Sequence, residues 1–407
     1  MSLPIIVIGI GEDGPEGLGQ TAREALSGAT QIAGAKRHLA MLPDTDKRPR
    51  HAWGKDLIAD INKLATLAEQ ETVCVLASGD PLQHGIAVRM IDTLGVDAVR
   101  VLPHPGAFAL SAARMGWSLS DPMLTCISVH AEPFAALRRA IQPNVRLLIL
   151  SRNGDSPQAV TETLNAMGYG TSPVTVLEHI GGASEKRTDG FASAGFAGSF
   201  QNLNTVCVHC IATGDAVRLS HAPGLADDAF DHDGTITKRE VRAVTLAALG
   251  PLPGEVLWDI GAGNGTIAIE WLRVEPRAHA VAFEQDPARI ESIRANADAL
   301  GVPALKIVAG IFPDTIGDDL PKPDVIFIGG GIAGDSDILV AAYDALKPGG
   351  RLVANAVTLQ AQAHLITAEE VLGGDLVSIG IAKSAAVGDL KALKPAIEVL
   401  QWRTRKS

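Results

Sequence analysis

The strongest constraint on the fold is a turn in which three of five residues are glycine: Gly261, Gly263 and Gly265. It follows the apolar run 256–260, which is typical of a buried strand, and precedes a helix-like pattern through Trp271. A strand, a glycine turn and a helix in this order indicate a doubly wound α/β domain, whose ligand binds at the carboxyl ends of the strands. Because glycines let the backbone approach a ligand closely, the turn is predicted to touch that ligand.

The spacing of the glycines and the nearby acids indicate which ligand this is. A dinucleotide fingerprint has the spacing G-x-G-x-x-G, whereas this turn reads G-x-G-x-G and closely follows Asp259. A carboxylate suits a cationic ligand and repels a pyrophosphate. Glu284 ends the next strand-like run, where a carboxylate accepts hydrogen bonds from ribose hydroxyls. A ribose, a positive charge and no phosphate describe S-adenosylmethionine, which Asp259, Glu284 and the three glycines are predicted to bind.

Length and charge limit the other function classes. A chain of 407 residues is predicted to form two or three domains, and its 46% hydrophobic and 20% charged residues are typical of a globular protein. The net charge of −11 argues against a nucleic-acid-binding surface but permits a local basic pocket for an anionic small molecule. No basic signal-peptide segment and no apolar run of about 18 residues is evident, so we expect a cytoplasmic protein without a membrane span.

The motif CVHC, formed by Cys207 and Cys210, is predicted to be structural. It lies inside a strand-like run, and no second cysteine pair completes a zinc site. Free cysteine is among the most buried residue types, so we expect both thiols in the core. No metal site is predicted.

Strand-like runs and helical patterns alternate on both sides of a segment of different composition. Residues 216–233 combine mixed charge, proline and glycine with little periodicity, and are predicted to be a linker. The predicted domains are therefore residues 1–215 and 234–407. The strand-like runs of the first domain are 4–10, 72–80, 98–103, 124–130, 146–151, 173–179 and 205–214.

Local signals predict where several helices begin. Two pairs have the spacing of a capping box: Thr21 with Glu24, and Thr237 with Glu240. Asp286, which a proline follows, is a predicted N-cap.

A second glycine turn lies near the N-terminus. Residues 9–14, GIGEDG, satisfy the dinucleotide fingerprint literally, but such a match alone is weak evidence. Together with ASGDP at 77–81 and PHPGAFAL at 103–110, the segment resembles the tetrapyrrole methylases, also called class III methyltransferases. This resemblance covers roughly residues 3–215 and implies a fold of two α/β lobes with S-adenosylmethionine in the cleft between them. The cofactor-binding residues that it implies are Gly9, Gly11, Gly79, Asp80, Pro81, Pro105 and Gly106.

Two further segments carry the same resemblance. SVHAEP is similar to a substrate-side segment in which Gly and Arg often stand where this chain has Ala131 and Glu132, and it implies substrate contacts at Ser128 and His130. VLEHIGGASEKR, at 176–187, is similar to a segment of the second lobe. No histidine is assigned a catalytic proton transfer.

The C-terminal half resembles the decarboxylating precorrin methyltransferase domain of cobalamin biosynthesis, which has the Rossmann-like class I methyltransferase fold. The matched segments are TKREVR at 237–242, AGIFPD at 309–314, IFIGGG at 326–331 and LKPGGRLVANAVTL at 346–359. Arg239 departs from the Thr-Lys-Glu-Glu-Val-Arg-like opening of that family. The resemblance spans nearly all of residues 234–400 and implies that Ala309 and Gly310 also contact the cofactor.

Three basic residues lie near the start of this domain's first predicted helix. Lys238, Arg239 and Arg242 are candidates to bind the carboxylates of a tetrapyrrole substrate. The alternative, that they are solvated charges on an exposed helix face, is equally compatible with the sequence.

The two families in this order imply a bifunctional methyltransferase. The N-terminal domain is expected to methylate precorrin-6B at C5. The C-terminal domain is expected to methylate C15 and to remove the carboxyl group of the C12 acetate, giving precorrin-8. The resemblance implies one S-adenosylmethionine site per domain and a homo-oligomer, and it assigns no residue to the decarboxylation.

Three alternatives make different predictions. An NAD-dependent dehydrogenase requires the usual glycine spacing and no carboxylate beside the pyrophosphate, and residues 259–265 fail both tests. A methyltransferase that acts on another tetrapyrrole, or on oxygen, shares the same cofactor site. A ligand-sensing module binds the cofactor without turnover.

Overall fold

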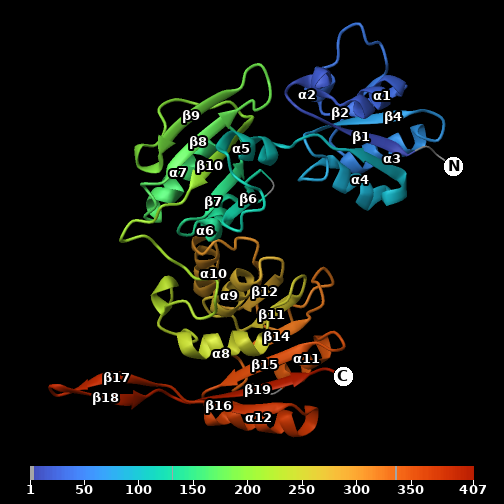
Figure 1. The fold of residues 1–407 in the computed structure, drawn as a ribbon. Helices are drawn as coiled ribbons and strands as arrows, with labels where there is room; N and C mark the ends of the chain where they lie inside the picture. The colour runs from blue at the N-terminus through green and yellow to red at the C-terminus, as the bar shows by residue number, and fades with distance from the viewer. Residues whose placement is uncertain (1–3, 131, 335–336) are drawn as a thin grey trace. The chain divides into compact units, whose positions relative to one another are not determined.

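The computed structural model describes residues 4–130, 132–334 and 337–407. The chain divides into two compact units, Met1–Glu132 with Ala140–Val217, and Pro133–Arg139 with Arg218–Ser407. Ala131 lies outside the described residues. Strands and helices alternate in both units, which confirms the α/β prediction (Figure 1).

The first lobe of the first unit is a parallel five-stranded sheet with helices on both faces. Its strands, in spatial order, are β3 (Arg50–Ala52), β2 (Gln31–Gly34), β4 (Val73–Ser78), β1 (Ile5–Ile10) and β5 (Val99–Leu102). Its helices are α1 (Gln20–Gly28), α2 (Lys36–Leu39), α3 (Leu57–Leu67) and α4 (Ile86–Leu94). Ile5 and Val7 of β1 pack with α3 and α4, whereas Ile8 and Ile10 pack with α1 and α2. Because the strands are parallel, the turns after β1, β4 and β5 lie at one edge of the sheet.

The second lobe is a mixed five-stranded sheet. Its strands, in spatial order, are β6 (Leu124–Ser128), β7 (Arg146–Leu150), β10 (Asn204–His209), β8 (Pro173–Glu178) and β9 (Lys186–Phe191), and only β6 and β7 pair in parallel. Its helices are α5 (Ala107–Met115) and α7 (Ser156–Ala166), and the short α6 (Leu137–Ala140) contains the sequence boundary between the units. Cys207 and Cys210 are buried, and burial raises the pKa of each thiol to about 12, which confirms their prediction as core residues.

The second unit is a seven-stranded sheet. Its strands, in spatial order, are β13 (Lys306–Ala309), β12 (His279–Glu284), β11 (Val256–Ile260), β14 (Val325–Ile328), β15 (Arg351–Ala356), β19 (Val399–Arg405) and β16 (Asp375–Ile379). Its helices are α8 (Arg239–Leu249), α9 (Thr266–Val274), α10 (Pro287–Ala299), α11 (Asp337–Ala345) and α12 (Leu359–Leu372). The strands from β13 to β15 are parallel, and β19 is antiparallel to both of its neighbours. The chain runs outward from β11 to β13 and returns to the other side of β11 at β14, so the strand order switches direction there. Ligands of doubly wound sheets bind at such a switch.

Part of the segment predicted as a linker is integral to this second unit. Leu225 and Phe230 are buried in its core, packed with residues of α8 and α9. The backbone N–H groups of Gly224 and Leu225 donate to the Glu270 carboxylate on α9, at 2.6 and 2.9 Å. The sequence signal failed because a segment without periodicity can still bury single apolar side chains.

A two-stranded hairpin extends from the second unit beside β19 and β16 (Figure 1). It consists of β17 (Ala382–Val387) and β18 (Leu390–Pro395), which pair with each other and with no other strand of the described residues. Nearly all of its side chains are exposed, including Leu390 and Leu393 at 77% and 73%.

The local helix signals had mixed outcomes. Asp286 caps α10, because its carboxylate accepts the backbone N–H of Ala288 at 2.8 Å, as predicted. Both predicted capping boxes are wrong, since α1 begins after Gly19 and α8 after Lys238, without a side-chain cap. Glu240 instead pairs with Lys383 of the hairpin at 3.0 Å.

Across the described ranges, no helix has both the length and the apolar composition needed to cross a bilayer. Within the same ranges, no group of three or more His, Cys, Asp or Glu residues is arranged to hold a metal ion.

Candidate functional site

The glycine turn of the second unit lies at the switch point between β11 and β14. Gly261 and Ala262 donate their N–H groups to the Phe283 carbonyl of β12, at 3.1 and 3.0 Å. Gly261 has φ +67°, and a Cβ on it would lie 3.1 Å from the backbone of Gly330, which follows β14. The turn and the IFIGGG segment are therefore packed backbone to backbone, which explains the need for glycine.

The other two glycines of the turn have different surroundings. Gly265 has φ +78°, and a Cβ there would lie 3.0 Å from a side-chain carbon of Ile293 on α10. Gly263 has φ +59°, but a Cβ there would meet no atom within 4 Å. Gly265 thus serves the packing of the helices, whereas Gly263 faces open space in which a ligand can approach the backbone.

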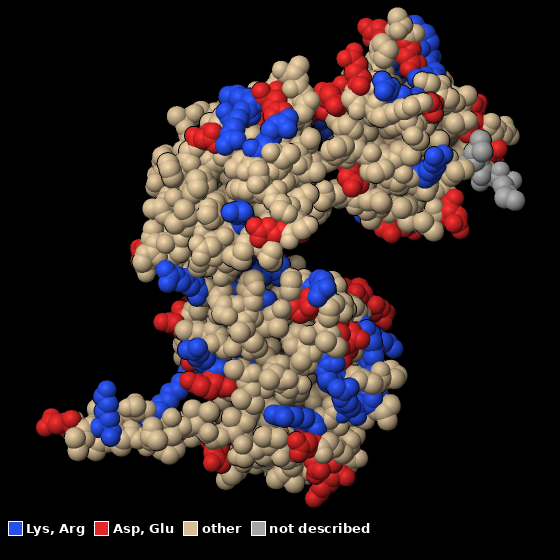
Figure 2. Space-filling view, in the orientation of Figure 1, with Lys and Arg blue, Asp and Glu red and all other residues tan. Residues whose placement is uncertain are grey.

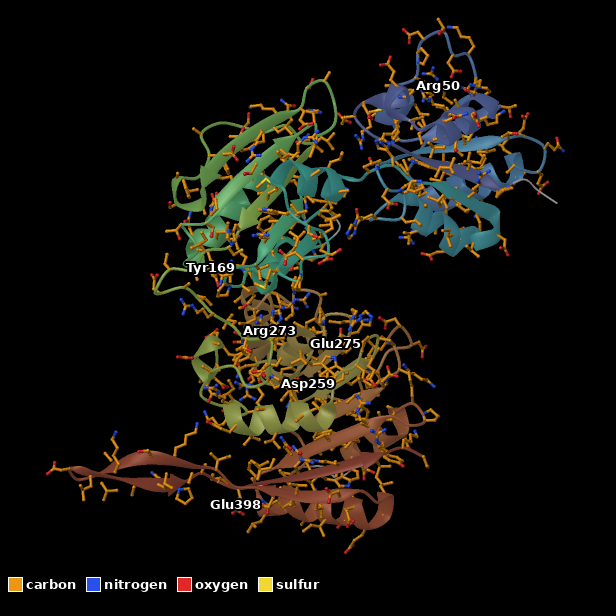
Figure 3. All side chains as sticks on the ribbon, viewed as in Figure 1. Arg50, Tyr169, Asp259, Arg273, Glu275 and Glu398 are labelled. Atoms are coloured by element: carbon orange, nitrogen blue, oxygen red, sulfur yellow. The ribbon has the colours of Figure 1, made fainter. Side chains whose placement is uncertain are left out.

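Asp259, which is labelled in Figure 3, is the penultimate residue of β11, just before this turn, and is 1% exposed. Its Oδ2 accepts the Ala268 N–H of α9 at 3.0 Å, while Oδ1 is buried and has no partner among the described residues. Burial raises the pKa of Asp259 to about 7, the bond from Ala268 opposes this shift, and the charge of Glu284 adds to it. A buried carboxylate oxygen without a partner fits a site that is completed by a cationic ligand.

Glu284 ties the glycine turn to the end of β12. Its Oε2 accepts the Gly263 N–H at 2.8 Å, and its Oε1 accepts the N–H groups of Gln285 and Asp286 at 2.9 and 3.0 Å. Each carboxylate oxygen has two lone pairs, so these bonds leave acceptor capacity for a ribose hydroxyl. Ala309 and Gly310 lie at the same edge, since Ala309 is the register partner of Glu284 and Gly310 donates to the Glu284 carbonyl at 2.9 Å.

The three basic residues near the start of α8 have unlike environments. Lys238 and Arg239 are exposed, as anion-binding residues at a cleft are expected to be. Arg242 is fully buried, with ion pairs to Glu270 at 2.6 Å and to Asp227 at 3.3 Å. Its guanidinium also donates to the carbonyls of Leu225 and Thr237 and lies over the Phe230 ring. Arg242 therefore differs from the prediction of a substrate contact, because its donors are used within the core of the second unit.

In the first unit, the turns after β1, β4 and β5 meet. Gly79 donates its N–H to the Ile10 carbonyl at 3.0 Å, and His104 donates to the Gly79 carbonyl at 3.3 Å. A Cβ on Gly9 would collide with the Gly79 carbonyl, and a Cβ on Gly79 would lie 2.7 Å from the Gly106 Cα. The structure thus brings together three segments that are separate in the sequence.

The other residues predicted to bind the cofactor lie in the same three turns. Gly11 is half-buried, and Pro81 is buried. Asp80 accepts the Leu82 N–H at 2.9 Å, which is also the bond that a simple strand-ending turn makes. Pro105 is exposed. The role of these residues in cofactor binding stays a prediction.

The predicted substrate contacts of the first unit lie on its second lobe. Ser128 ends β6 and is buried, and His130 follows it and is exposed. Their contact with the substrate stays a prediction.

A charged cluster beside the N-terminal glycine turn was missed. Glu12 pairs with Arg37 at 3.1 Å and with His179 at 3.0 Å, and Arg37 also donates to the Ser78 hydroxyl. The available signal was the position of Arg37 and Ser78, each at or just after the end of a strand of the first sheet.

Comparison with known proteins connects both units to described families. Residues 4–194 match the Tetrapyrrole (Corrin/Porphyrin) Methylases, and residues 228–406 match the Precorrin methyltransferase domain. The chain is 41% identical over 402 residues to the precorrin-6Y C(5,15)-methyltransferase [decarboxylating] of a Sinorhizobium species, which covers 99% of this chain and 96% of that protein. It is 42% identical over 405 residues to the protein of the same name from Mycobacterium tuberculosis, covering 99% and 100%. A shorter relative, the cobalt-precorrin-7 C(5)-methyltransferase of Salmonella typhimurium, is 31% identical over 182 residues, covering 45% of this chain and 88% of that protein.

Proposed function

Because the chain belongs to the family of the decarboxylating precorrin-6Y C(5,15)-methyltransferases, we propose that it methylates precorrin-6B at C5 and C15 and removes the carboxyl group of the C12 acetate to give precorrin-8. The relatives are named for precorrin-6Y, so we define the substrate by its chemistry. It is a precorrin that lacks methyl groups at C5 and C15 and retains the C12 acetate. The single observation that carries the proposal is the identity to these relatives over 99% of the chain.

The two methylations and the decarboxylation are divided between the domains in this proposal. The tetrapyrrole methylase domain, which we place at residues 1–215, methylates C5, and the existence of a shorter relative named for C5 methylation alone supports this division. The domain at 234–407 methylates C15 and carries out the decarboxylation. Cytoplasmic location remains part of the proposal.

We assign one S-adenosylmethionine site to each domain. In the second unit, the unpartnered oxygen of Asp259 is suited to a cation, and Glu284 is suited to the ribose. The open space beside Gly263 admits the nucleoside, with Ala309 and Gly310 at the same edge. In the first unit, the site is formed by the converging turns that contain Gly9, Gly11, Gly79, Asp80, Pro81, Pro105 and Gly106.

Methyl transfer from a sulfonium needs little acid or base catalysis by the protein. S-adenosylmethionine, when bound, supplies a methyl group on a positively charged sulfur. The residues of each site hold the acceptor carbon in line with that methyl group and exclude water, which are the main contributions to such a displacement. Decarboxylation leaves an electron pair on the substrate, and the conjugated macrocycle accepts it. We assign no catalytic residue to this step.

Lys238 and Arg239 are proposed to bind carboxylates of the macrocycle at the second unit. Both are exposed at the start of α8, so their charges are available to a ligand. Ser128 and His130 remain proposed substrate contacts of the first unit.

We further propose that the protein is a homo-oligomer and that the β17–β18 hairpin contacts a second copy. A lone two-stranded hairpin is at best marginally stable in water. We therefore infer that a second chain covers the exposed side chains of Leu390 and Leu393. The hairpin carries three lysines, and Figure 2 shows basic side chains along it. Lys383 lies directly opposite Lys394 in the register of the two strands. Glu240 offsets the charge of Lys383, and the positive charge of the hairpin suits acidic side chains on a second copy, since the chain has 46 Asp and Glu residues.

The test of the proposed function uses the full chain, S-adenosylmethionine labelled on its methyl group, and the precorrin defined above. A product that has gained two labelled methyl groups and lost one carbon dioxide by mass is the expected result. Unchanged precorrin in the presence of bound cofactor indicates a sensor, and a preference for NAD indicates a dehydrogenase. Calorimetry with S-adenosylhomocysteine is expected to find two equivalents per chain, and one equivalent contradicts the two-site assignment.

A further inference from the structure

The cluster of Glu12, Arg37, Ser78 and His179 has no role in the proposed function so far. Arg37 lies on α2, directly after β2, and Ser78 is the last residue of β4. Glu12 lies in the glycine turn after β1, directly after Gly11, which is predicted to bind the cofactor. All three therefore occupy the sheet edge at which the predicted cofactor turns converge.

The guanidinium of Arg37 is oriented by groups on several elements. Its Nη2 donates to the Ser78 hydroxyl, which is also 3.1 Å from the Nε2 of buried His38. Burial, with the nearby charge of Arg37 as a second cause, lowers the pKa of His38 to about 4, so that ring is neutral near pH 7. The Ser78 hydroxyl oxygen accepts the bond from Arg37, and the same hydroxyl links Arg37 to His38.

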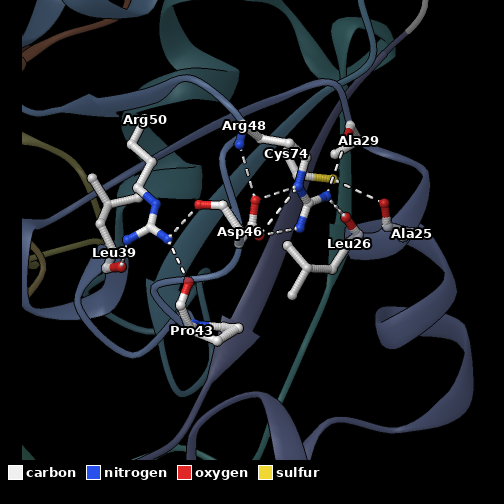
Figure 4. Close-up of polar contacts among 9 residues, drawn as sticks. All are labelled: Ala25, Leu26, Ala29, Leu39, Pro43, Asp46, Arg48, Arg50 and Cys74. Atoms are coloured by element: carbon white, nitrogen blue, oxygen red, sulfur yellow. Dashed lines mark hydrogen bonds and ion pairs between the residues drawn. The ribbon is translucent and has the colours of Figure 1, made fainter.

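The helix that carries Arg37 is fixed at its end by the loop that follows it (Figure 4). Arg50 donates to the Leu39 carbonyl at 3.0 Å and to the Pro43 carbonyl at 2.9 Å. Arg48 pairs with Asp46 at 2.6 Å, and this hydrogen bonding lowers the pKa of Asp46 to about 2. The bonds from Arg50 fix the backbone at the end of α2, the helix that carries Arg37.

Glu12, the ion-pair partner of Arg37, also contacts the second lobe of the first unit. Glu12 is shared between Arg37 and His179, a residue of the second lobe with φ +48°, a conformation that histidine adopts more often than most other residues with a side chain. A Cβ on Gly182 would lie 2.7 Å from the Glu12 Cβ, so the chain after His179 passes close to Glu12.

The Arg37–Glu12 pair contributes little to stability. The two side chains are 44% and 20% exposed, and ion pairs with this exposure are typically worth about 0–1 kcal/mol. An arginine fork binds carboxylates with two parallel hydrogen bonds, which makes it a preferred residue for recognising them. Arg37 thus already binds a carboxylate, which is the side chain of Glu12.

We propose that Arg37 binds a carboxylate of the ligand at the first unit's site, and that Glu12 occupies this position until the ligand carboxylate displaces it. The inference rests on the proposed function, in which the substrate carries several carboxylates. Two sources have the same chemistry: a side chain of the macrocycle, and the methionine carboxylate of the cofactor. In both cases the exchange frees Glu12 to pair with His179 alone.

The test compares the full-length Arg37→Gln, Arg37→Lys and Glu12→Gln proteins with wild type. Arg23→Gln, an exposed arginine of α1 on the same lobe, is the matched control. Steady-state C5 methylation is measured against precorrin at saturating cofactor and against cofactor at saturating precorrin, with thermal unfolding as the fold control. C15 methylation by the same molecules is the internal control.

Losing a charge-assisted hydrogen bond is expected to raise the KM for precorrin by about 10- to 100-fold in Arg37→Gln, with a smaller change in kcat. Arg37→Lys is expected to restore part of the affinity, and Glu12→Gln to lower KM because the competing carboxylate is gone. C15 methylation is expected to be unchanged. An increase in KM for the cofactor instead identifies the methionine carboxylate as the source.

Unchanged KM values for both ligands in Arg37→Gln overturn the inference. So does an equal loss in Arg23→Gln, because the effect is then one of general surface charge. Failure of the proposed function is recognised separately, since wild type then shows no C5 methylation.

Discussion

Replacing Asp259 with asparagine is expected to stabilise the free protein while weakening cofactor binding. The carboxyl is 1% exposed, and its pKa rises from 3.8 to about 7, chiefly through burial. A shift of about three units corresponds to at most about 4 kcal/mol of cost for the charged form in the native state. An asparagine side-chain oxygen can still accept the Ala268 N–H but carries no charge to desolvate.

The pH dependence follows from the direction of this shift. The native state holds the proton more tightly than the unfolded state, so the stability gained from neutral Asp259 is fully present below about pH 4 and is lost as pH rises through about 7. The advantage of Asp259→Asn over wild type should therefore be near zero at about pH 4, grow between these values and level off at about pH 8.

The assay is urea unfolding of the full chain between about pH 5 and about pH 8, followed by tryptophan fluorescence. Trp258, Trp271 and Trp402 are all buried in the second unit and report on it. Asp344→Asn, at an exposed position of the same unit, is the control. A variant that is less stable than wild type at pH 8, or whose advantage does not change with pH, refutes the reasoning. Titration with S-adenosylmethionine should show weaker binding by the same variant.

Three further outcomes are expected. Arg242→Ala should lower the free energy of unfolding of the second unit by about 3–5 kcal/mol, because it leaves the Glu270 carboxylate buried without its cation. Arg239→Ala, at an exposed position, should change it by less than about 0.5 kcal/mol, and equal unfolding midpoints for the two variants contradict this prediction. The Gly265→Ala protein should unfold at a lower temperature than the Gly263→Ala protein, because both positions have positive φ but only at position 265 does a side-chain carbon lie 3.0 Å from the added Cβ. The Gly263→Ala protein should instead bind the cofactor more weakly in calorimetry. Replacing residues 382–395 with a short glycine–serine turn should reduce the molar mass measured by light scattering to that of one chain, and an unchanged oligomer argues against the hairpin contact.

The sequence predicted best those parts that local patterns determine. The glycine turn 261–265, its flanking strand and helix, and the acids at both strand ends follow from periodicity and spacing. Tertiary contacts between segments that are distant in the sequence could not be predicted from the residue types alone. The burial of Arg242 depends on Glu270, and the contact of Glu12 with His179 joins segments 167 residues apart. Charge and spacing cannot distinguish a buried ion pair from an exposed one, because the difference lies in what packs around it.

The core position of Leu225 and Phe230 determines where the two halves of this protein can be separated. A fragment that begins at residue 234 lacks both side chains, each worth about 1.5–3 kcal/mol of burial, and it removes the N–H groups that Glu270 accepts. A fragment that begins at residue 218 retains all of these interactions. Any separation of the two units must therefore preserve the segment ahead of α8, because its side chains and backbone N–H groups are part of the core of the second unit.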